Sequence, residues 1–264
     1  MTSADVGHRQ AGGMGGTGGP GGPVFRAVTA ELAAIRARAP GRAPRVLDVG
    51  GGSGAWAVPL ATAGCAVSVV DPSPNALATL RRRAHDAGVE ELVTAVAGEV
   101  ERLADAAPPD GADLVLGHGL LEVVDDPHAT VRALAAAAAP GGAVSLLVAG
   151  RFAAVLARTL AGRLAEARAL LADPDGRFGP DDALRRRLDA AGLRRALEAA
   201  PELRLELLQG DGVLECWAPG AGRDEGAGAP AAAGALGELE DLATAQPALI
   251  DVAARLHAIA RRAG

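Results

Sequence analysis

A glycine-rich turn between two short apolar runs constrains this 264-residue chain more than any other feature of its sequence. The first run, Arg45–Val49, ends directly before the turn Gly50–Gly54, and the second, Val67–Val70, ends directly before Asp71. Short apolar runs without polar alternation are typical of strands that are buried on both faces of a parallel sheet. Because parallel neighbours need a crossover between them, the pair predicts a strand–helix–strand unit with the glycines at its first turn.

The same alternation of apolar runs and helical patterns continues along the chain. Three further runs are expected to be strands, at Val93–Ala97, Ala112–Leu116 and Ala143–Val148. Helical spacing and cap residues predict helices between the strands, and these are Val24–Ala37, Trp56–Ala63, Pro74–Ala87 and Pro127–Ala138. Alternation of this kind predicts an α/β fold with a doubly wound, mostly parallel sheet and helices on both faces.

Helical patterns dominate after the fifth apolar run. One long helix is expected over Phe152–Leu171, and two shorter helices, broken at Gly192, are expected within Asp181–Ala199. The segments Leu203–Leu208 and Val213–Trp217 are then expected to pair as a closing hairpin.

We therefore expect one main domain with attached segments. Residues 1–22 and 218–235 are rich in small residues, which predicts a disordered tail and a flexible loop. Residues 23–217 are expected to form the domain, with a helical insertion over residues 151–200. Residues 236–264 return to a helical pattern, which predicts a C-terminal helix packed on the domain.

Composition argues against several classes of protein. The net charge is −6, and all 26 basic residues are arginines, so a broad basic surface for nucleic acid is not expected. The two cysteines are too few for a disulfide framework and lack CxxC spacing. No apolar stretch is long enough to span a membrane, and the N-terminus has no apolar signal core. We expect a cytoplasmic protein without a metal or a membrane partner, and the sequence favours no oligomeric state.

The turn predicts a site for an adenosine ligand, because glycines let the backbone approach it and Asp71 can accept hydrogen bonds from two ribose hydroxyls. Gly50, Gly52 and Ala55 also fit the loose dinucleotide fingerprint GxGxxA, so the glycines alone leave a nicotinamide or flavin dinucleotide open. Asp48 favours S-adenosylmethionine (SAM). A carboxylate beside the turn repels a pyrophosphate and stabilises the ammonium and sulfonium groups of SAM.

The stretch VLDVGGGSG, followed by Asp71, resembles motif I and the ribose-binding acid of class I SAM-dependent methyltransferases. The resemblance implies a Rossmann-like, seven-stranded sheet with added C-terminal helices, in which Val213–Trp217 would suit the last, antiparallel strand. Glu99 falls at the position where members of that family contact the adenine amino group. An equally good interpretation is that Glu99 is a solvated acid at a helix start. Motif and resemblance together predict that the cofactor is contacted by Asp48, Gly50, Gly51, Gly52, Gly54, Asp71, Pro72, Glu99 and Val100.

A narrower resemblance covers most of the chain. The segments His118–Pro127, Pro140–Leu147 and Leu256–Arg262 are similar to the tRNA 5-carboxymethoxyuridine methyltransferase family. Those enzymes methylate the carboxylate of a modified wobble uridine, so the resemblance implies a tRNA acceptor. It also implies that Arg26 faces the carboxylate of the cofactor.

Two positions depart from that family. Gly150 stands where the tRNA enzymes commonly have asparagine, and Gly212 stands where they have an arginine that could pair with an acidic substrate. The departures leave two alternatives open. One is a methyltransferase for a small-molecule carboxylate or hydroxyl, and the other is a SAM-binding protein without transferase activity.

Among the remaining residues, His118 is the candidate catalytic group, because it ends the fourth strand on the side where an acceptor binds in open α/β sheets. It could act as a base, as a positioning donor or as a cofactor contact, and a supporting structural role is the alternative. His257 is expected to be packed in a helix, and Trp56 to be part of the core. Arg185–Arg187 is expected to be a solvated helix face, with phosphate contacts as the alternative. With no tyrosine in the chain, few aromatic side chains are available to stack on a base, which favours a small acceptor or a stacking platform made of arginines.

Overall fold

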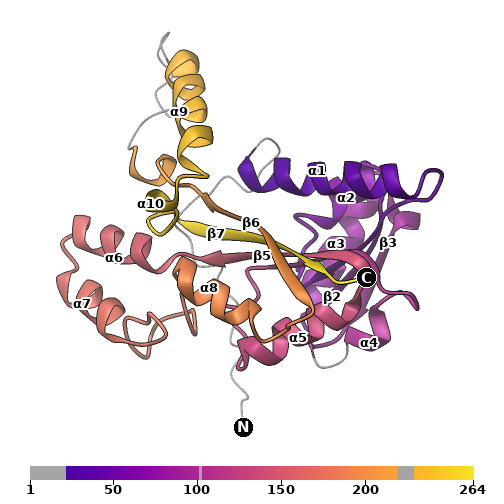
Figure 1. Cartoon of the computed structure of the whole chain (residues 1–264), viewed down its shortest axis with the longest axis horizontal. Helices are drawn as coiled ribbons and strands as arrows, with labels where there is room; N and C mark the ends of the chain where they lie inside the picture. Colours follow the sequence, from indigo (N-terminus) through magenta and orange to yellow (C-terminus); the bar gives the residue numbers. More distant parts are fainter. Residues whose placement is uncertain (1–21, 101–102, 219–228) are drawn as a thin grey trace.

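A mixed sheet lies at the centre of the computed structural model, which describes residues 22–100, 103–218 and 229–264 (Figure 1). Its strands are β1 (Arg45–Val49), β2 (Ala66–Asp71), β3 (Val93–Ala97), β4 (Ala112–His118), β5 (Ala138–Ala149), β6 (Leu203–Asp211) and β7 (Arg255–Arg262). Within the described residues these seven strands lie in the order β3-β2-β1-β4-β5-β7-β6. Strands β1 to β5 pair in parallel, whereas β7 runs antiparallel to both β5 and β6.

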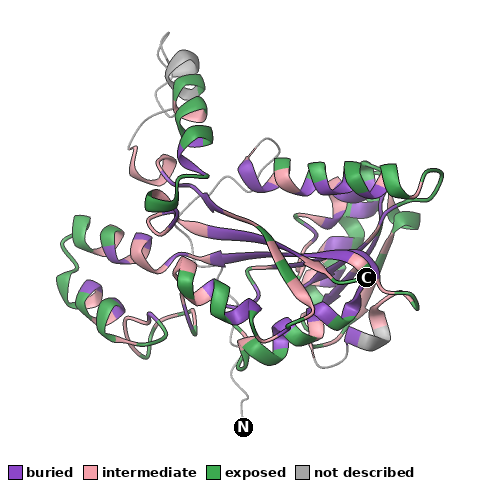
Figure 2. Ribbon diagram, viewed as in Figure 1, coloured by how far each residue is buried: buried purple, intermediate pink, exposed green. Residues whose placement is uncertain are grey.

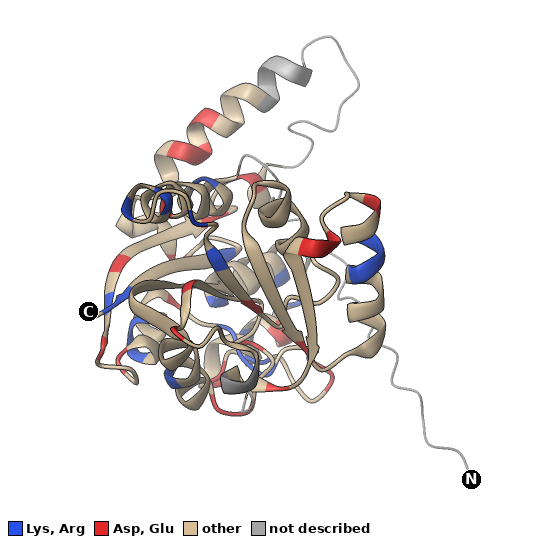
Figure 3. Cartoon of the chain, turned by 90° about the vertical axis from the view of Figure 1, so that its right-hand side faces the viewer, with Lys and Arg blue, Asp and Glu red and all other residues tan. Residues whose placement is uncertain are grey.

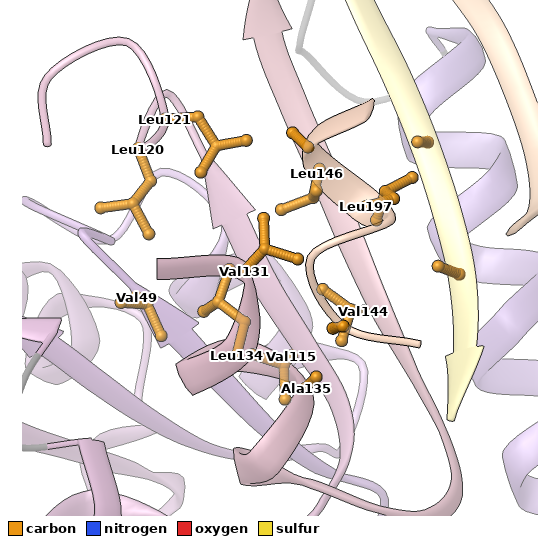
Figure 4. Packing of buried hydrophobic residues seen from close by; sticks show 14 of the residues in the cluster. Val49, Val115, Leu120, Leu121, Val131, Leu134, Ala135, Val144, Leu146 and Leu197 are labelled. Atoms are coloured by element: carbon orange, nitrogen blue, oxygen red, sulfur yellow. The ribbon is translucent and has the colours of Figure 1, made fainter. Parts of the chain in front are cut away.

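Helices cover both faces of the sheet. One face is covered by α1 (Pro23–Arg38), α2 (Ala57–Thr62) and α3 (Pro74–Asp86). The other face is covered by α4 (Leu103–Ala106), α5 (Pro127–Ala137) and α8 (Ala190–Leu197). Figure 4 shows side chains of this second face, where Val131 and Leu134 of α5 pack against Val115 and Leu146 of the sheet. Burial follows the same layers, since the central strands are largely buried and the outer sides of the helices are exposed (Figure 2).

Cap residues explain where two helices next to the carboxyl edge of the sheet begin. Ser73 precedes Pro74, and its hydroxyl accepts a hydrogen bond from the first turn of α3 at 3.3 Å. Asp126 precedes Pro127, and its carboxylate accepts two backbone N–H groups of α5, both at 2.9 Å. A proline at the first position loses no hydrogen bond, and the cap satisfies N–H groups that the helix leaves free.

The predicted α/β fold with a mostly parallel seven-stranded sheet is confirmed. All five strands predicted in the first part of the chain are present, as are the four helices predicted among them. Strand β5 is longer than the expected Ala143–Val148 and begins at Ala138, where the helix Pro127–Ala138 was expected to end.

Two helix predictions after β5 are wrong. The expected single helix Phe152–Leu171 is a hairpin of α6 (Arg151–Leu160) and α7 (Leu164–Ala172), and Gly162 turns the chain between them with a φ of +71°. The segment expected to hold two helices broken at Gly192 contains α8 alone. Gly192 lies in the first turn of α8, where its N–H donates to the cap Asp189 at 2.6 Å, so it helps to start this helix.

The predicted C-terminus is wrong in its secondary structure. Residues 236–264 were expected to be one helix, but they contain the end of α9 (Ala229–Ala243), the short α10 (Pro247–Ile250) and strand β7. The expected last strand, Val213–Trp217, instead forms a turn and the short 3-10 helix η3 (Glu215–Trp217). Since β7 lies between β5 and β6, it is buried on both faces. Its apolar residues do not alternate with exposed polar ones, so periodicity cannot distinguish this short segment from a helix.

The predicted tail over residues 1–22 lies outside the described residues except for Gly22, as does most of the loop predicted over residues 218–235. Residues 229–235 of that loop belong to α9. None of the helices in the described ranges is both long and apolar enough to cross a membrane.

Candidate functional site

An open cleft lies at the carboxyl edge of the parallel strands, near the point where β1 and β4 adjoin. The chain leaves β1 toward α2 on one face and leaves β4 toward α5 on the other, so a crevice opens between the two strands. The cleft has a volume of 1380 Å³. Sites for one small ligand are typically about 300–1000 Å³, so this cleft has room for a cofactor and a second molecule.

The glycine turn after β1 borders the cleft. Gly50, Gly52 and Gly54 have φ values of +71°, +56° and +81°, which residues with side chains rarely adopt. Gly51 has no positive φ, but a Cβ atom at this position would overlap the carboxylate of Asp48. The turn therefore lies directly against that carboxylate, and a larger residue at Gly51 would displace it.

Asp71, at the end of β2, joins the two parts of the predicted motif. Its Oδ2 accepts the N–H of Gly52 at 3.0 Å, and its Oδ1 accepts the N–H of Ser73 at 2.8 Å. The side chain lines the cleft. Because each carboxylate oxygen can accept two hydrogen bonds, Asp71 keeps acceptor sites for a ligand while it holds the turn.

Asp48 lies beneath the turn and is 1% exposed. Its Oδ2 has no hydrogen-bond partner among the described residues. Burial, together with the negative charge of Asp71, raises the pKa of Asp48 to about 7. Asp48 does not itself line the cleft, but its carboxylate lies directly against the turn at Gly51, so a cation bound above the turn would be close enough to stabilise its charged form.

The described lining of the cleft is acidic. It includes the carboxylates of Asp71, Glu99, Asp125 and Asp126, and no arginine, lysine or histidine side chain belongs to it within the described ranges. Arg185 pairs with Asp125 and offsets one of these charges. A pyrophosphate would be repelled by such a lining, whereas a cationic ligand would be attracted. No group of three His, Cys, Asp or Glu side chains in the described part of the chain is placed to hold a metal ion.

The cleft brings together part of the predicted cofactor set. The predicted residues that line it are Gly50, Gly52, Asp71, Pro72, Glu99 and Val100. The predicted residues outside the described lining are Arg26, Asp48, Gly51, Gly54 and His118. Sequence reasoning missed the polar side chains that α3 and α5 add to the lining, which are Ser73, Asn75, Thr79, Asp126 and Thr130. The caps Ser73 and Asp126 carried the available signal, since each precedes a proline at a helix start.

Arg26 lies in the first turn of α1, and its guanidinium pairs with Asp241 of α9. Both side chains are about half exposed. The predicted contact of Arg26 with a cofactor carboxylate therefore stays a prediction, and in this structure the side chain joins two helices.

His118 ends β4 directly before Gly119, which lines the cleft. Its Nε2 lies 2.8 Å from the hydroxyl of Ser145, and its ring meets Trp56 edge to face with 4.7 Å between ring centroids. Trp56 in turn stacks on Phe25 of α1. Burial holds the pKa of His118 well below its ordinary value, and electrostatic repulsion by His257 and Arg255 lowers it further. The ring is therefore neutral at pH 7.

The loop between β4 and α5 forms one wall of the cleft and is anchored by Arg186. This guanidinium is 8% exposed and donates to the backbone carbonyls of Leu121, Val124 and Asp125 at 2.6 to 3.0 Å. The expectation that the arginine cluster is a solvated face is therefore wrong for Arg186. No sequence signal marked it, because its partners are backbone atoms about sixty residues earlier in the chain.

The two departures from the tRNA enzymes have structural explanations. A Cβ atom at Gly150 would overlap the carbonyl oxygen of Ala253, in the segment just before β7. Gly212 has a φ of +66° in the turn after β6. Both glycines are required by the path of the backbone, so neither one indicates a loss of function.

A family described as "Methyltransferase domain" matches residues 24–198. These residues include β1 to β5, the glycine turn and the helices on both faces of the sheet.

Individual proteins show the same similarity. A ubiquinone biosynthesis O-methyltransferase from Xanthomonas campestris pv. campestris is 33% identical over 183 residues, which are 69% of this chain and 71% of that protein. The enzyme of the same name from Bordetella pertussis is 41% identical over 98 residues, and the chain spans only 39% of its length. Magnesium protoporphyrin IX methyltransferase from Synechocystis PCC 6803, solved with S-adenosylhomocysteine bound, has the same fold. It is 14% identical with a TM-score of 0.55, and the match covers 90% of this chain and 83% of that one.

Proposed function

Because this chain belongs to the methyltransferase domain family, we propose that it transfers a methyl group from SAM to an oxygen acceptor that binds in the same cleft as the cofactor. One observation carries the choice of cofactor. The cleft combines a glycine turn with acidic side chains and, among its described residues, has no basic one. This lining suits a cationic nucleoside and repels a dinucleotide pyrophosphate.

The residues present fit SAM in three places. The carboxylate of Asp71 keeps acceptor sites for ribose hydroxyls, and Glu99 with Val100 borders the space beyond β3 where an adenine would lie. Asp48 has a buried, unpartnered oxygen beneath the turn, whose charge a bound cation would stabilise. SAM supplies an electrophilic methyl group on a sulfonium. The protein's part is to align an acceptor oxygen with that group and to exclude water, which needs no dedicated base.

For the acceptor, the proposal is a small molecule with a hydroxyl or carboxylate group. The curated relatives are named as O-methyltransferases of ubiquinone biosynthesis, and the cleft volume exceeds what one small ligand fills. Basic and acidic segments are interspersed over the side of the molecule that Figure 3 shows, and the net charge is −6. RNA binding generally relies on a basic surface and stacking aromatic side chains, so these features support a small acceptor.

The carboxylate of a modified wobble uridine in tRNA is the alternative acceptor, supported by the sequence resemblance around His118–Pro127. The purified protein would be incubated with SAM labelled in its methyl group, once with a metabolite extract and once with total tRNA. The proposal predicts label in a small molecule. Label in tRNA would favour the alternative acceptor, and SAM binding without transfer to either pool would indicate a binding protein without transferase activity.

A further inference from the structure

Four polar side chains form a row across the second half of the sheet. His118 of β4, Ser145 of β5, His257 of β7 and Gln209 of β6 lie on four neighbouring strands. The Ser145 hydroxyl lies 2.8 Å from Nε2 of His118 and 2.9 Å from Nε2 of His257. The side-chain nitrogen of Gln209 lies 3.0 Å from Nδ1 of His257. We call these four residues the polar row.

The polar row lies on the face of the sheet that α1 covers, where most of the buried side chains around it are apolar. Leu147 and Ile259 on the same face belong to the core cluster that includes Val24 and Val28 of α1. His257 is completely buried, and Gln209 is 7% exposed. Burying polar groups among apolar ones is unfavourable unless they bond to each other, so packing alone does not explain why a polar row is kept here.

The hydrogen bonds of the row run in one direction. An amide nitrogen can only donate, so Gln209 makes Nδ1 of His257 an acceptor and leaves the proton on its Nε2. That Nε2–H donates to the Ser145 oxygen. Because the Ser145 hydroxyl has no other acceptor among the described residues, its own proton then goes to Nε2 of His118. The proton of a neutral His118 must therefore be on Nδ1. Burial lowers the pKa of both imidazoles, that of His257 to about 3, so both rings are neutral at pH 7.

The row is satisfied at every contact except its last atom. Nδ1 of His118 is buried and has no hydrogen-bond partner among the described residues, and the next residue, Gly119, lines the cleft. We propose that Gln209, His257 and Ser145 are positioning residues that hold His118 as a neutral Nδ1–H donor, which binds a carboxylate oxygen of a ligand instead of removing a proton. The inference rests on the proposed function only for the identity of that ligand.

The tautomer of His118 tests the proposal without any ligand. The chain has five histidines, so histidine-selective ¹⁵N labelling gives a small set of long-range ¹H–¹⁵N spectra, and His118→Gln identifies the signals of His118. We expect a protonated Nδ1 and an unprotonated Nε2 at pH 7. A His118 that carries its proton on Nε2, or that exchanges freely between the two forms, would overturn the proposal.

Variants of the row show whether distant residues set this state. In Gln209→Glu the carboxylate accepts from Nδ1 of His257, which reverses each bond, so His118 should change to the Nε2–H form. Ser145→Thr keeps the hydroxyl and should keep the native tautomer, whereas Ser145→Ala should leave a mixture. Leu207→Met, two residues before Gln209 in β6 and packed against the same core, is the matched control and should leave the spectrum of His118 unchanged. If His118 keeps its native tautomer in a folded Gln209→Glu protein, the row has only a structural role. If that variant does not fold, the comparison of Ser145→Thr with Ser145→Ala decides the same question.

Titration with S-adenosylhomocysteine identifies the source of the carboxylate. A shift of the His118 Nδ1 signal on its binding would assign the donor to the carboxylate of the cofactor. Binding measured by calorimetry without that shift would reserve the donor for the methyl acceptor. Absence of binding would contradict the proposed function but leave the tautomer result intact.

Discussion

Contacts in the two halves of the sheet span different distances along the chain. One half forms the cleft, and the other half carries the polar row. In the first half, Gly52 and Asp71 are hydrogen-bonded across 19 positions. In the second half, Ser145 and His257 are bonded across 112 positions. This fold therefore builds its candidate cofactor site from one local unit, whereas the candidate acceptor side is assembled from segments that meet only after the chain has folded. Substitutions in the two halves should therefore act differently, and four predictions test this contrast.

The largest expected effect is a loss of SAM affinity in Gly51→Val. The new side chain would overlap the carboxylate of Asp48, so the turn must move away from the position that a cofactor needs. We expect the affinity for SAM, measured by calorimetry, to fall at least about 100-fold, with a loss of about 1–3 kcal/mol in the free energy of unfolding. Gly237→Ala in α9, where a Cβ atom meets no neighbour, should leave SAM affinity unchanged and raise the free energy of unfolding by at most about 1 kcal/mol, because alanine favours a helix over glycine. Normal SAM binding by Gly51→Val would show that the turn does not contact the cofactor.

Arg186→Met should have the largest effect on the loop between β4 and α5. The substitution keeps an apolar stem but removes donors to three backbone carbonyls, at Leu121, Val124 and Asp125. We expect a loss of about 2–4 kcal/mol in the free energy of unfolding and faster hydrogen exchange in residues 121–126. The neighbouring Arg185→Met breaks only an exposed pair with Asp125 and should lose less than about 1 kcal/mol. Equal losses in the two variants would contradict the anchoring role of Arg186.

Asp48→Asn should stabilise the unliganded protein. The pKa of Asp48 is raised from 3.8 to about 7 in the folded state, so the unfolded chain ionises first as the pH rises. Wild-type stability is therefore lost between about pH 4 and pH 7, and the variant avoids this loss. We expect a gain of about 1–3 kcal/mol at pH 8, a smaller gain at pH 5, and weaker SAM binding.

The matched control for this pH dependence is Asp113→Asn at the opposite edge of the sheet. Burial raises the pKa of Asp113, but hydrogen bonds and charge from Arg42 and Arg45 more than offset it, so the net pKa is lowered. A carboxyl with a lowered pKa contributes stability that is present at neutral pH and lost in acid. Asp113→Asn should therefore destabilise the protein at pH 8. Thermal unfolding at the two pH values measures both variants, and destabilisation by Asp48→Asn at pH 8 would refute the account of Asp48.

The smallest effect is expected from Arg26, whose side chain joins α1 to α9. Its ion pair with Asp241 is about half exposed, so Arg26→Ala and Asp241→Ala should each change the free energy of unfolding by less than about 1 kcal/mol. If Arg26 also turns to a bound cofactor, as the sequence resemblance implies, only Arg26→Ala should weaken SAM binding, by several-fold. Equal SAM affinities in the two variants would limit Arg26 to the helix contact.

The sequence predicted the first five strands and the glycine turn because their signals are local. Glycines that need positive φ, an acid at a strand end and a serine or aspartate before a proline can each be identified within a few residues. Six of the predicted cofactor residues line the cleft for this reason. Asp48 was predicted to contact the cofactor, and it lies outside the cleft lining; its position beneath the turn depends on packing around Gly51 that no pattern shows.

The features that the sequence missed or predicted wrongly depend on contacts between distant segments. Strand β7 has the alanines and leucine of a helix, and only its place between β5 and β6 makes it a strand. His257 was expected in a helix for that reason, and its hydrogen bond to Ser145 could not be foreseen. Arg186 looks like a surface arginine in sequence, because the carbonyls that bury it come from another loop.

The central claim is that the glycine turn and Asp71 form a site for a cationic nucleoside. Isothermal titration of the wild-type protein and of Asp71→Ala with SAM, and of the wild type with NAD⁺, tests it most directly, with thermal unfolding to confirm that the variant is folded. Loss of the hydrogen bonds that two ribose hydroxyls donate to the carboxylate should weaken SAM binding by about 30-fold or more, and NAD⁺ should not bind measurably. Equal SAM affinity in the two proteins, or tighter binding of NAD⁺ than of SAM, would contradict the claim.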